Sequence, residues 1–150
     1  MELNEIKDAI DFAIEKEQEA ANFYKNMAGK VDLKSLADEL RKMALAEESH
    51  RDRLRKMDVS AYSGSAVKPV MNLKIADYLV EKEPTPDMTW QDLVQIAMKR
   101  ELAAMRLYTD LAKLTTDPQT RQLFENLAVE EEAHKLYFEK IWDEEILTDN

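Results

Sequence analysis

Two Glu-x-x-His motifs, Glu47–His50 and Glu131–His134, contain the residues best suited to chemistry in this chain. A three-residue step keeps both side chains on one face of a helix, so that one metal ion can bind the carboxylate and the imidazole together. A single motif of this kind on an acidic helix is more often a solvated face. Here both histidines of the chain follow a glutamate at the same spacing, which favours a metal site.

The two motifs lie in an internal repeat, in which the second half of the chain follows the first at an offset of 84 residues (131 − 47). The positions that match across this offset are Glu17 and Glu101, Tyr24 and Tyr108, Glu47 and Glu131, and His50 and His134. They align without an insertion or a deletion. We interpret the repeat as an internal duplication of a helical hairpin.

Long helices are expected to carry these residues, because the chain of 150 residues has only 2 glycines and 4 prolines. The predicted helices cover about 4–28, 32–57, 89–114 and 117–146. Asn4 is the expected N-cap of the first helix, and Thr89 with Asp92 resembles a capping box at the start of the third. Asp117 and Pro118 predict an N-cap followed by proline at the first position of the fourth.

Short connections within each pair of helices predict two antiparallel hairpins, and hence an all-α four-helix bundle. The predicted single domain, 1–150, comprises a first hairpin at about 4–57, a crossover at about 58–88 and a second hairpin at about 89–147. The crossover is long enough to run the length of a bundle whose helices measure roughly 37 Å, and it has room for a short helix over 73–80. A flexible interdomain linker is the alternative. We favour the crossover because neither hairpin could bury its apolar seam alone.

A glutamate interrupts the apolar seam of each predicted helix near its middle: Glu17, Glu47, Glu101 and Glu131. Residues that are equidistant from the turn of an antiparallel hairpin lie at the same height. Glu17 and Glu47 are equidistant from residue 32, and Glu101 and Glu131 from residue 116. Docking the two hairpins with approximate two-fold symmetry would therefore bring four glutamates and both histidines to one interior point.

Four ionised carboxylates inside a protein are costly unless they are neutralised. Two divalent cations would supply the four positive charges required, and the imidazoles would complete the coordination. Glutamate and histidine ligands favour Fe, Mn or Zn over Mg or Ca. Tyr24 and Tyr108 lie two helical turns from a seam glutamate; they either fill the core, or hydrogen-bond and orient a ligand glutamate of the opposite helix, and the two roles are compatible.

Composition excludes several classes of function. The formal net charge of −10 opposes binding to nucleic acid and to anionic membrane surfaces. The sequence contains no cysteine, which excludes disulfides and cysteine-ligated iron–sulfur or rubredoxin-type centres within it, so electrons for redox chemistry would come from another molecule. The chain has no long apolar run and no secretory signal at its start, and we expect a cytoplasmic protein.

With these motifs, the sequence resembles the rubrerythrin-like branch of the ferritin-like superfamily of di-iron carboxylate proteins. The resemblance implies a ferritin-like bundle with a left-handed crossover and a non-haem di-iron centre. Its metal ligands would be Glu17, Glu47, His50, Glu101, Glu131 and His134, with Glu47 and Glu131 bridging the ions. No further catalytic residue is implied, and Tyr24 and Tyr108 would support the ligands.

The sequence departs from the family pattern at two positions. Rubrerythrins proper carry an additional glutamate on the third helix, and its counterpart here is Ala104. The symmetric set of six ligands is also similar to that of bacterioferritin, but Glu48 stands where that family has its haem methionine, so we expect no haem. Rubrerythrins also append a cysteine-rich rubredoxin domain, which this sequence lacks.

The leading hypothesis is a redox enzyme with two Fe ions that reduces hydrogen peroxide or dioxygen, using electrons from an external donor such as a rubredoxin. The alternative is a ferroxidase or iron-storage protein of the ferritin type. A purely structural bundle is a third interpretation. We expect a homodimer or a higher homo-oligomer.

Overall fold

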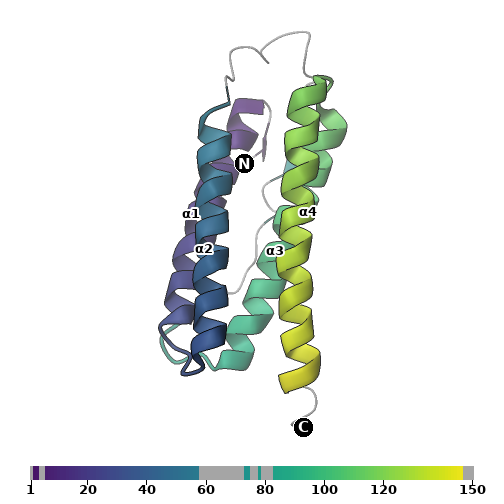
Figure 1. Cartoon of the computed structure of the whole chain (residues 1–150). Coiled ribbons are helices and arrows are strands. Elements are labelled where there is room, and N and C mark those ends of the chain that lie inside the picture. The colour runs from purple at the N-terminus through teal and green to yellow at the C-terminus, as the bar shows by residue number, and fades with distance from the viewer. Residues whose placement is uncertain (1, 4–5, 58–72, 75–77, 79–82, 147–150) are drawn as a thin grey trace. The chain divides into compact units, whose positions relative to one another are not determined.

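The computed structural model describes residues 2–3, 6–57, 73–74, 78 and 83–146 (Figure 1). The chain forms two compact units, residues 4–65 and residues 1–3 with 66–150, which are treated separately below. Four long helices form two hairpins, one in each unit, which confirms the predicted all-α class. In the part of the chain that the structure describes, no helix has the length and the apolar character needed to cross a membrane.

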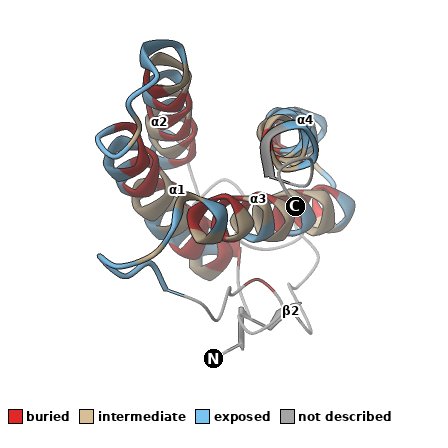
Figure 2. Cartoon of the chain, turned by 90° about the horizontal axis from the view of Figure 1, so that it is seen from below, coloured by how far each residue is buried: buried red, intermediate tan, exposed pale blue. Residues whose placement is uncertain are grey.

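The first hairpin consists of α1 (Ile6–Ala28) and α2 (Lys34–Arg55), which pack against each other. The buried residues follow the helical period and gather along one side of each helix (Figure 2). They include Ile10, Tyr24, Met27, Leu40 and Leu54, each at most 1% exposed. This apolar stripe is interrupted at mid-length by buried glutamates, as the sequence predicts.

The ends of these helices agree with the prediction to within two residues where they are described. Helix α1 ends at Ala28, immediately before Gly29, while its predicted N-cap, Asn4, lies outside the described residues. Helix α2 begins at Lys34 and not near Asp32. Its N-cap is Leu33, which has an extended backbone and makes no side-chain cap. The Leu33 carbonyl instead accepts the first helical hydrogen bond, from the backbone N–H of Ala37 at 3.0 Å.

The second hairpin consists of α3 (Trp90–Leu114) and α4 (Pro118–Ile141). The predicted capping box at α3 is confirmed: the Thr89 hydroxyl accepts from the N–H of Asp92, and the Asp92 carboxylate accepts from the N–H of Thr89. Helix α4 ends five residues before the predicted Ile146, and a π-helical turn over Trp142–Ile146 continues it.

Parts of the predicted crossover, 58–88, lie outside the described residues. Within it, β2 (Leu73–Lys74) pairs antiparallel with β1 (Glu2–Leu3), so the expected short helix over 73–80 is wrong at its start. The backbone hydrogen bonds of these residues go to the beginning of the chain and not to a helical turn. Farther along, the Tyr78 hydroxyl donates to the Asp110 carboxylate at 2.8 Å, which fastens the connection to α3.

Helix α4 begins with the predicted N-cap, Asp117, whose carboxylate accepts hydrogen bonds from the N–H of Thr120 at 2.9 Å and from its hydroxyl at 2.8 Å. These two bonds lower the pKa of Asp117 below its ordinary value of 3.8. A carboxyl whose pKa is lower in the folded state stabilises the fold above its unfolded pKa, and loses this effect as the pH falls through the folded value.

We therefore expect Asp117→Ala to lower the melting temperature by about 2–4 °C at pH 7, and by less as the pH falls below about 4. Asp117→Asn is the control, because an amide caps a helix without titrating, and it should lose less at pH 7. Thermal unfolding followed by circular dichroism between pH 2.5 and 7 tests this. An Asp117→Ala deficit of the same size throughout that range would contradict the prediction.

Candidate metal centre

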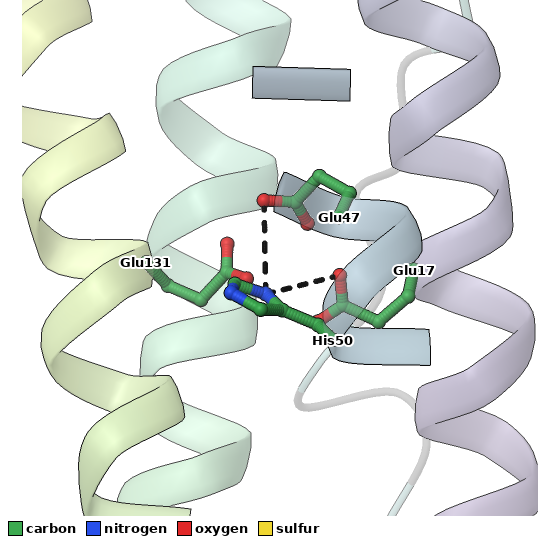
Figure 3. Close-up of side chains that lie close together, drawn as sticks. All are labelled: Glu17, Glu47, His50 and Glu131. Carbon is green, nitrogen blue, oxygen red and sulfur yellow. Dashed lines mark ion pairs between the residues drawn. The ribbon is translucent and has the colours of Figure 1, made fainter. Parts of the chain in front are cut away.

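Three ligand-type side chains meet inside the first hairpin: Glu17 from α1, and Glu47 and His50 from α2 (Figure 3). The Nδ1 atom of His50 lies 3.5 Å from a carboxylate oxygen of Glu17 and 3.9 Å from one of Glu47. All three side chains are at most 2% exposed. We call this set the first cluster.

The helical hairpin itself explains the first cluster. Glu47 and His50 are one turn apart on the same face of α2, and Glu17 lies at the same height on the antiparallel α1. The cluster therefore needs no loop residue and no unusual backbone geometry to form.

The same arrangement recurs in the second hairpin, where α3 contributes Glu101 and α4 contributes Glu131 and His134. His134 Nδ1 lies 3.6 Å from a carboxylate oxygen of Glu101 and 4.0 Å from one of Glu131. The two glutamates are at most 2% exposed and the His134 side chain is 14% exposed. This set is the second cluster, and its distances reproduce those of the first to within 0.1 Å.

Both clusters fit a metal ion on two counts. In each, one ligand atom per residue can be chosen so that all of these atoms lie within 4.8 Å of one another. Two atoms that each bind an ion such as Zn²⁺ at about 2.0–2.2 Å can be at most about 4.4 Å apart, and the His-to-Glu distances of 3.5–4.0 Å fall inside that limit. In charge, a protonated His50 would supply one positive charge against the two carboxylates of Glu17 and Glu47, whereas a divalent cation would balance both.

The two predicted supporting tyrosines are core residues. Tyr24 and Tyr108 are each 1% exposed, and the Tyr108 ring stacks on Phe124 with the ring centroids 6.3 Å apart. Packing in the core is therefore their observed role, and orientation of a ligand by their hydroxyl groups stays a prediction. Ala104 is only partly buried and offers no ligand atom in place of the additional rubrerythrin glutamate.

Two residues beside the first cluster were missed by sequence reasoning. Gln18 follows Glu17, Arg51 follows His50, and the Arg51 guanidinium donates to the Gln18 side-chain oxygen across the hairpin. The equal-height argument already indicates this contact, because Gln18 and Arg51 are also nearly equidistant from the turn. Glu48, next to Glu47, points to another partner and forms an ion pair with Lys25 at 2.6 Å.

Comparison with known families decides the membership of the chain. The rubrerythrin family model matches residues 8–142, a range that includes all six residues of the two clusters. The chain belongs to the rubrerythrin family. This family is part of the ferritin-like superfamily, as the sequence motifs predicted. The buried glutamates and histidines of this rubrerythrin-family chain form clusters that could hold metal.

A solved structure agrees with the fold of the rubrerythrin family. A hypothetical protein from Pyrococcus furiosus is similar to this chain with a TM-score of 0.70 and 23% sequence identity, over 90% of this chain and 86% of that one. At this level of identity the likeness shows the fold alone. No curated protein matches the sequence.

Proposed function

We propose that this protein is a rubrerythrin-type oxidoreductase that holds two iron ions and reduces hydrogen peroxide or dioxygen. The observation that carries the proposal is the duplicated cluster, because each hairpin supplies two buried carboxylates and one imidazole at separations that suit a metal ion. Such ligands bind iron, manganese or zinc, and membership of the rubrerythrin family favours iron.

We further propose that the two clusters face each other and form one dinuclear site, with Glu47 and Glu131 bridging the ions. Two divalent cations would then balance the charge of the four glutamates. The structural likeness supports this arrangement, because it covers 90% of the chain and therefore includes parts of both hairpins. Glu17 and Glu101 would each bind one ion, and His50 and His134 would complete the two sets.

When bound, the pair of ferrous ions would supply two electrons, which together with two protons from water convert one hydrogen peroxide into two water molecules. The buried helix seams would keep bulk solvent from the ligands. A separate one-electron carrier, such as a rubredoxin, would return the ferric ions to the ferrous state, because the sequence contains no cysteine for a second redox centre. We place this activity in the cytoplasm and in a homodimer or a higher homo-oligomer.

The test is a stopped-flow measurement on anaerobically reduced protein loaded with two Fe(II) per chain. We expect hydrogen peroxide to oxidise the bound iron at least about 100-fold faster than Fe(II) in the same buffer, which is about 2.7 kcal/mol in activation free energy. Glu17→Gln should remove most of this acceleration. Glu19→Gln is the matched control, since Glu19 is 43% exposed and pairs with Lys16 at 3.0 Å. Equal rates for wild-type protein and buffer would reject the proposal.

An iron-handling function, as a ferroxidase or storage protein, is the second candidate. It is favoured by the symmetry of the two clusters and by Ala104, which stands where a further rubrerythrin ligand would be. Iron uptake separates the two candidates. Saturation at two irons per chain supports the oxidoreductase, and uptake of many irons per chain by a large oligomer supports storage.

A further inference from the structure

The two hairpins differ along their outer edge, although their clusters match. In the first hairpin, two contacts join α1 to α2 beside the cluster: the Lys25–Glu48 ion pair at 2.6 Å and the hydrogen bond from Arg51 to Gln18 at 2.5 Å. Three of these four residues directly follow a member of the cluster in the sequence. We call these two contacts the cross-helix clamp.

The repeat places Leu102, Thr109, Glu132 and Lys135 at the positions of the clamp residues in the second hairpin. The Thr109 hydroxyl donates to the backbone oxygen of Met105, within its own helix, at 2.7 Å. Lys135 also pairs within its own helix, with Glu139 at 2.8 Å. These two side chains therefore bind along α3 and α4, where their counterparts bind across α1 and α2.

A groove of about 340 Å³ lies between α3 and α4 at these positions, and its lining includes Met105, Thr109, Ala128 and Glu132. The groove follows the turns that carry the second cluster, because Met105 is one turn after Glu101 and Ala128 is one turn before Glu131. Met105 and Ala128 are only partly buried.

The matching positions in the first hairpin are closed. Ala21 and Ala44 correspond to Met105 and Ala128, and they are 0% and 1% exposed. Small side chains let α1 and α2 approach closely at this level, and the clamp spans the same edge. A metal ion leaves a protein site when water or a competing ligand reaches it, or when the helices that hold it separate locally. Both routes are more restricted in the first hairpin than in the second.

We propose that the two metal positions exchange with solution at different rates. A divalent transition-metal ion held by the second cluster enters and leaves through the groove between α3 and α4, whereas an ion held by the first cluster is retained by the clamp. This inference rests on the proposed dinuclear metal site, and it assigns Gln18 and Arg51 as positioning residues of the first cluster.

Release of zinc to a chromogenic chelator, followed by stopped-flow absorbance, tests the inference without any redox activity. Protein loaded with two Zn²⁺ per chain should release them in two phases of equal amplitude, with rates that differ at least about tenfold. Removing His134 with His134→Ala should abolish the fast phase. His50→Ala should abolish the slow phase.

Exchanging residues between the repeats provides the decisive variants. Gln18→Leu/Arg51→Lys gives the first hairpin the residues of the second without changing the net charge, and it should accelerate the slow phase at least about tenfold. The reverse pair, Leu102→Gln/Lys135→Arg, should slow the fast phase. Lys34→Gln is the control, because it breaks an exposed ion pair of the same hairpin, with Asp38, away from the cluster. Melting temperatures measured in parallel detect a general loss of stability, which would accelerate both phases.

The outcomes separate this inference from the proposed function. Two zinc ions released in a single phase, or an unchanged slow phase in Gln18→Leu/Arg51→Lys, would overturn the difference in exchange and leave the dinuclear site intact. Binding of fewer than two zinc ions by the wild-type protein would overturn both. Selective acceleration of the slow phase by that double variant, with an unchanged fast phase, would establish the inference.

Discussion

Glu47→Gln is expected to reduce the number of tightly bound divalent ions from two to at most one per chain. An amide keeps the size of the side chain but removes the negative charge and one ligand oxygen from the first cluster, where Glu47 is 1% exposed. Affinity at the affected position should fall by more than about 100-fold, which is the upper range found when only a supporting residue of a metal ligand is removed. His134→Ala should cause an equal loss in the second cluster. Calorimetric titration with Zn²⁺ and metal analysis after anaerobic loading with Fe(II) measure both effects.

The matched control is Glu39→Gln, which changes the net charge by the same amount on the same helix. Glu39 is 44% exposed and pairs with Lys42 at 3.3 Å, so the variant should still bind two ions. If Glu47→Gln and His134→Ala both retained two tightly bound ions, the two clusters would not be the metal ligands.

The helices and their content of ligand residues are predictable from sequence because both depend on local rules. The stripe of apolar residues needs only the helical period, and the Thr89–Asp92 and Asp117 caps need only residues a few positions apart. The height at which Glu17 meets Glu47 follows from counting residues to the turn. The part of the site that lies within one hairpin is therefore predictable from the sequence.

Features that depend on long-range contacts or on side-chain rotamers are not predictable in this way. The pairing of Leu73–Lys74 with Glu2–Leu3 involves two residues on each strand, too few to show an alternating pattern, and the partners are far apart in sequence. Similarly, Leu33 replaces Asp32 as the boundary of α2 because the backbone turns one residue later than the side chains suggest. Gln18 and Arg51 can be placed at one height from the sequence, but their hydrogen bond depends on which rotamers pack between α1 and α2.

Removal of the metal ions is expected to have the largest effect on stability. A ligand that binds only the folded state stabilises it by about 4 kcal/mol when it is present at 1,000 times its dissociation constant. For a chain of this size that corresponds to a fall in melting temperature of about 10 °C or more after chelation. Calorimetry of the protein with two Zn²⁺ and after dialysis against a chelator measures the difference. An unchanged melting temperature would support a purely structural bundle instead.

The metal-free protein should also respond to neutral substitutions in the opposite direction from the metal-loaded protein. Without metal, Glu47 and Glu131 are buried carboxylates, 1% exposed each, beside other buried carboxylates of their hairpins. Replacing both by glutamine removes two buried charges while keeping the packing, so Glu47→Gln/Glu131→Gln should raise the free energy of unfolding of the metal-free protein by about 1–3 kcal/mol. The same variant should gain little from added zinc, and it should then be less stable than the metal-loaded wild type by about 4 kcal/mol.

This reversal of sign distinguishes a metal site from an ordinary polar core. If the glutamates stabilised the fold through hydrogen bonds within the protein, their replacement would destabilise it with or without metal. The control pair Glu39→Gln/Glu125→Gln removes two exposed carboxylates, whose ion pairs with Lys42 and Arg121 contribute at most about 1 kcal/mol each. Its stability relative to wild type should be the same in both states. Urea unfolding of the three proteins with and without zinc gives all of the required differences, and destabilisation of the metal-free protein by Glu47→Gln/Glu131→Gln would mean that the clusters are held together by the protein alone.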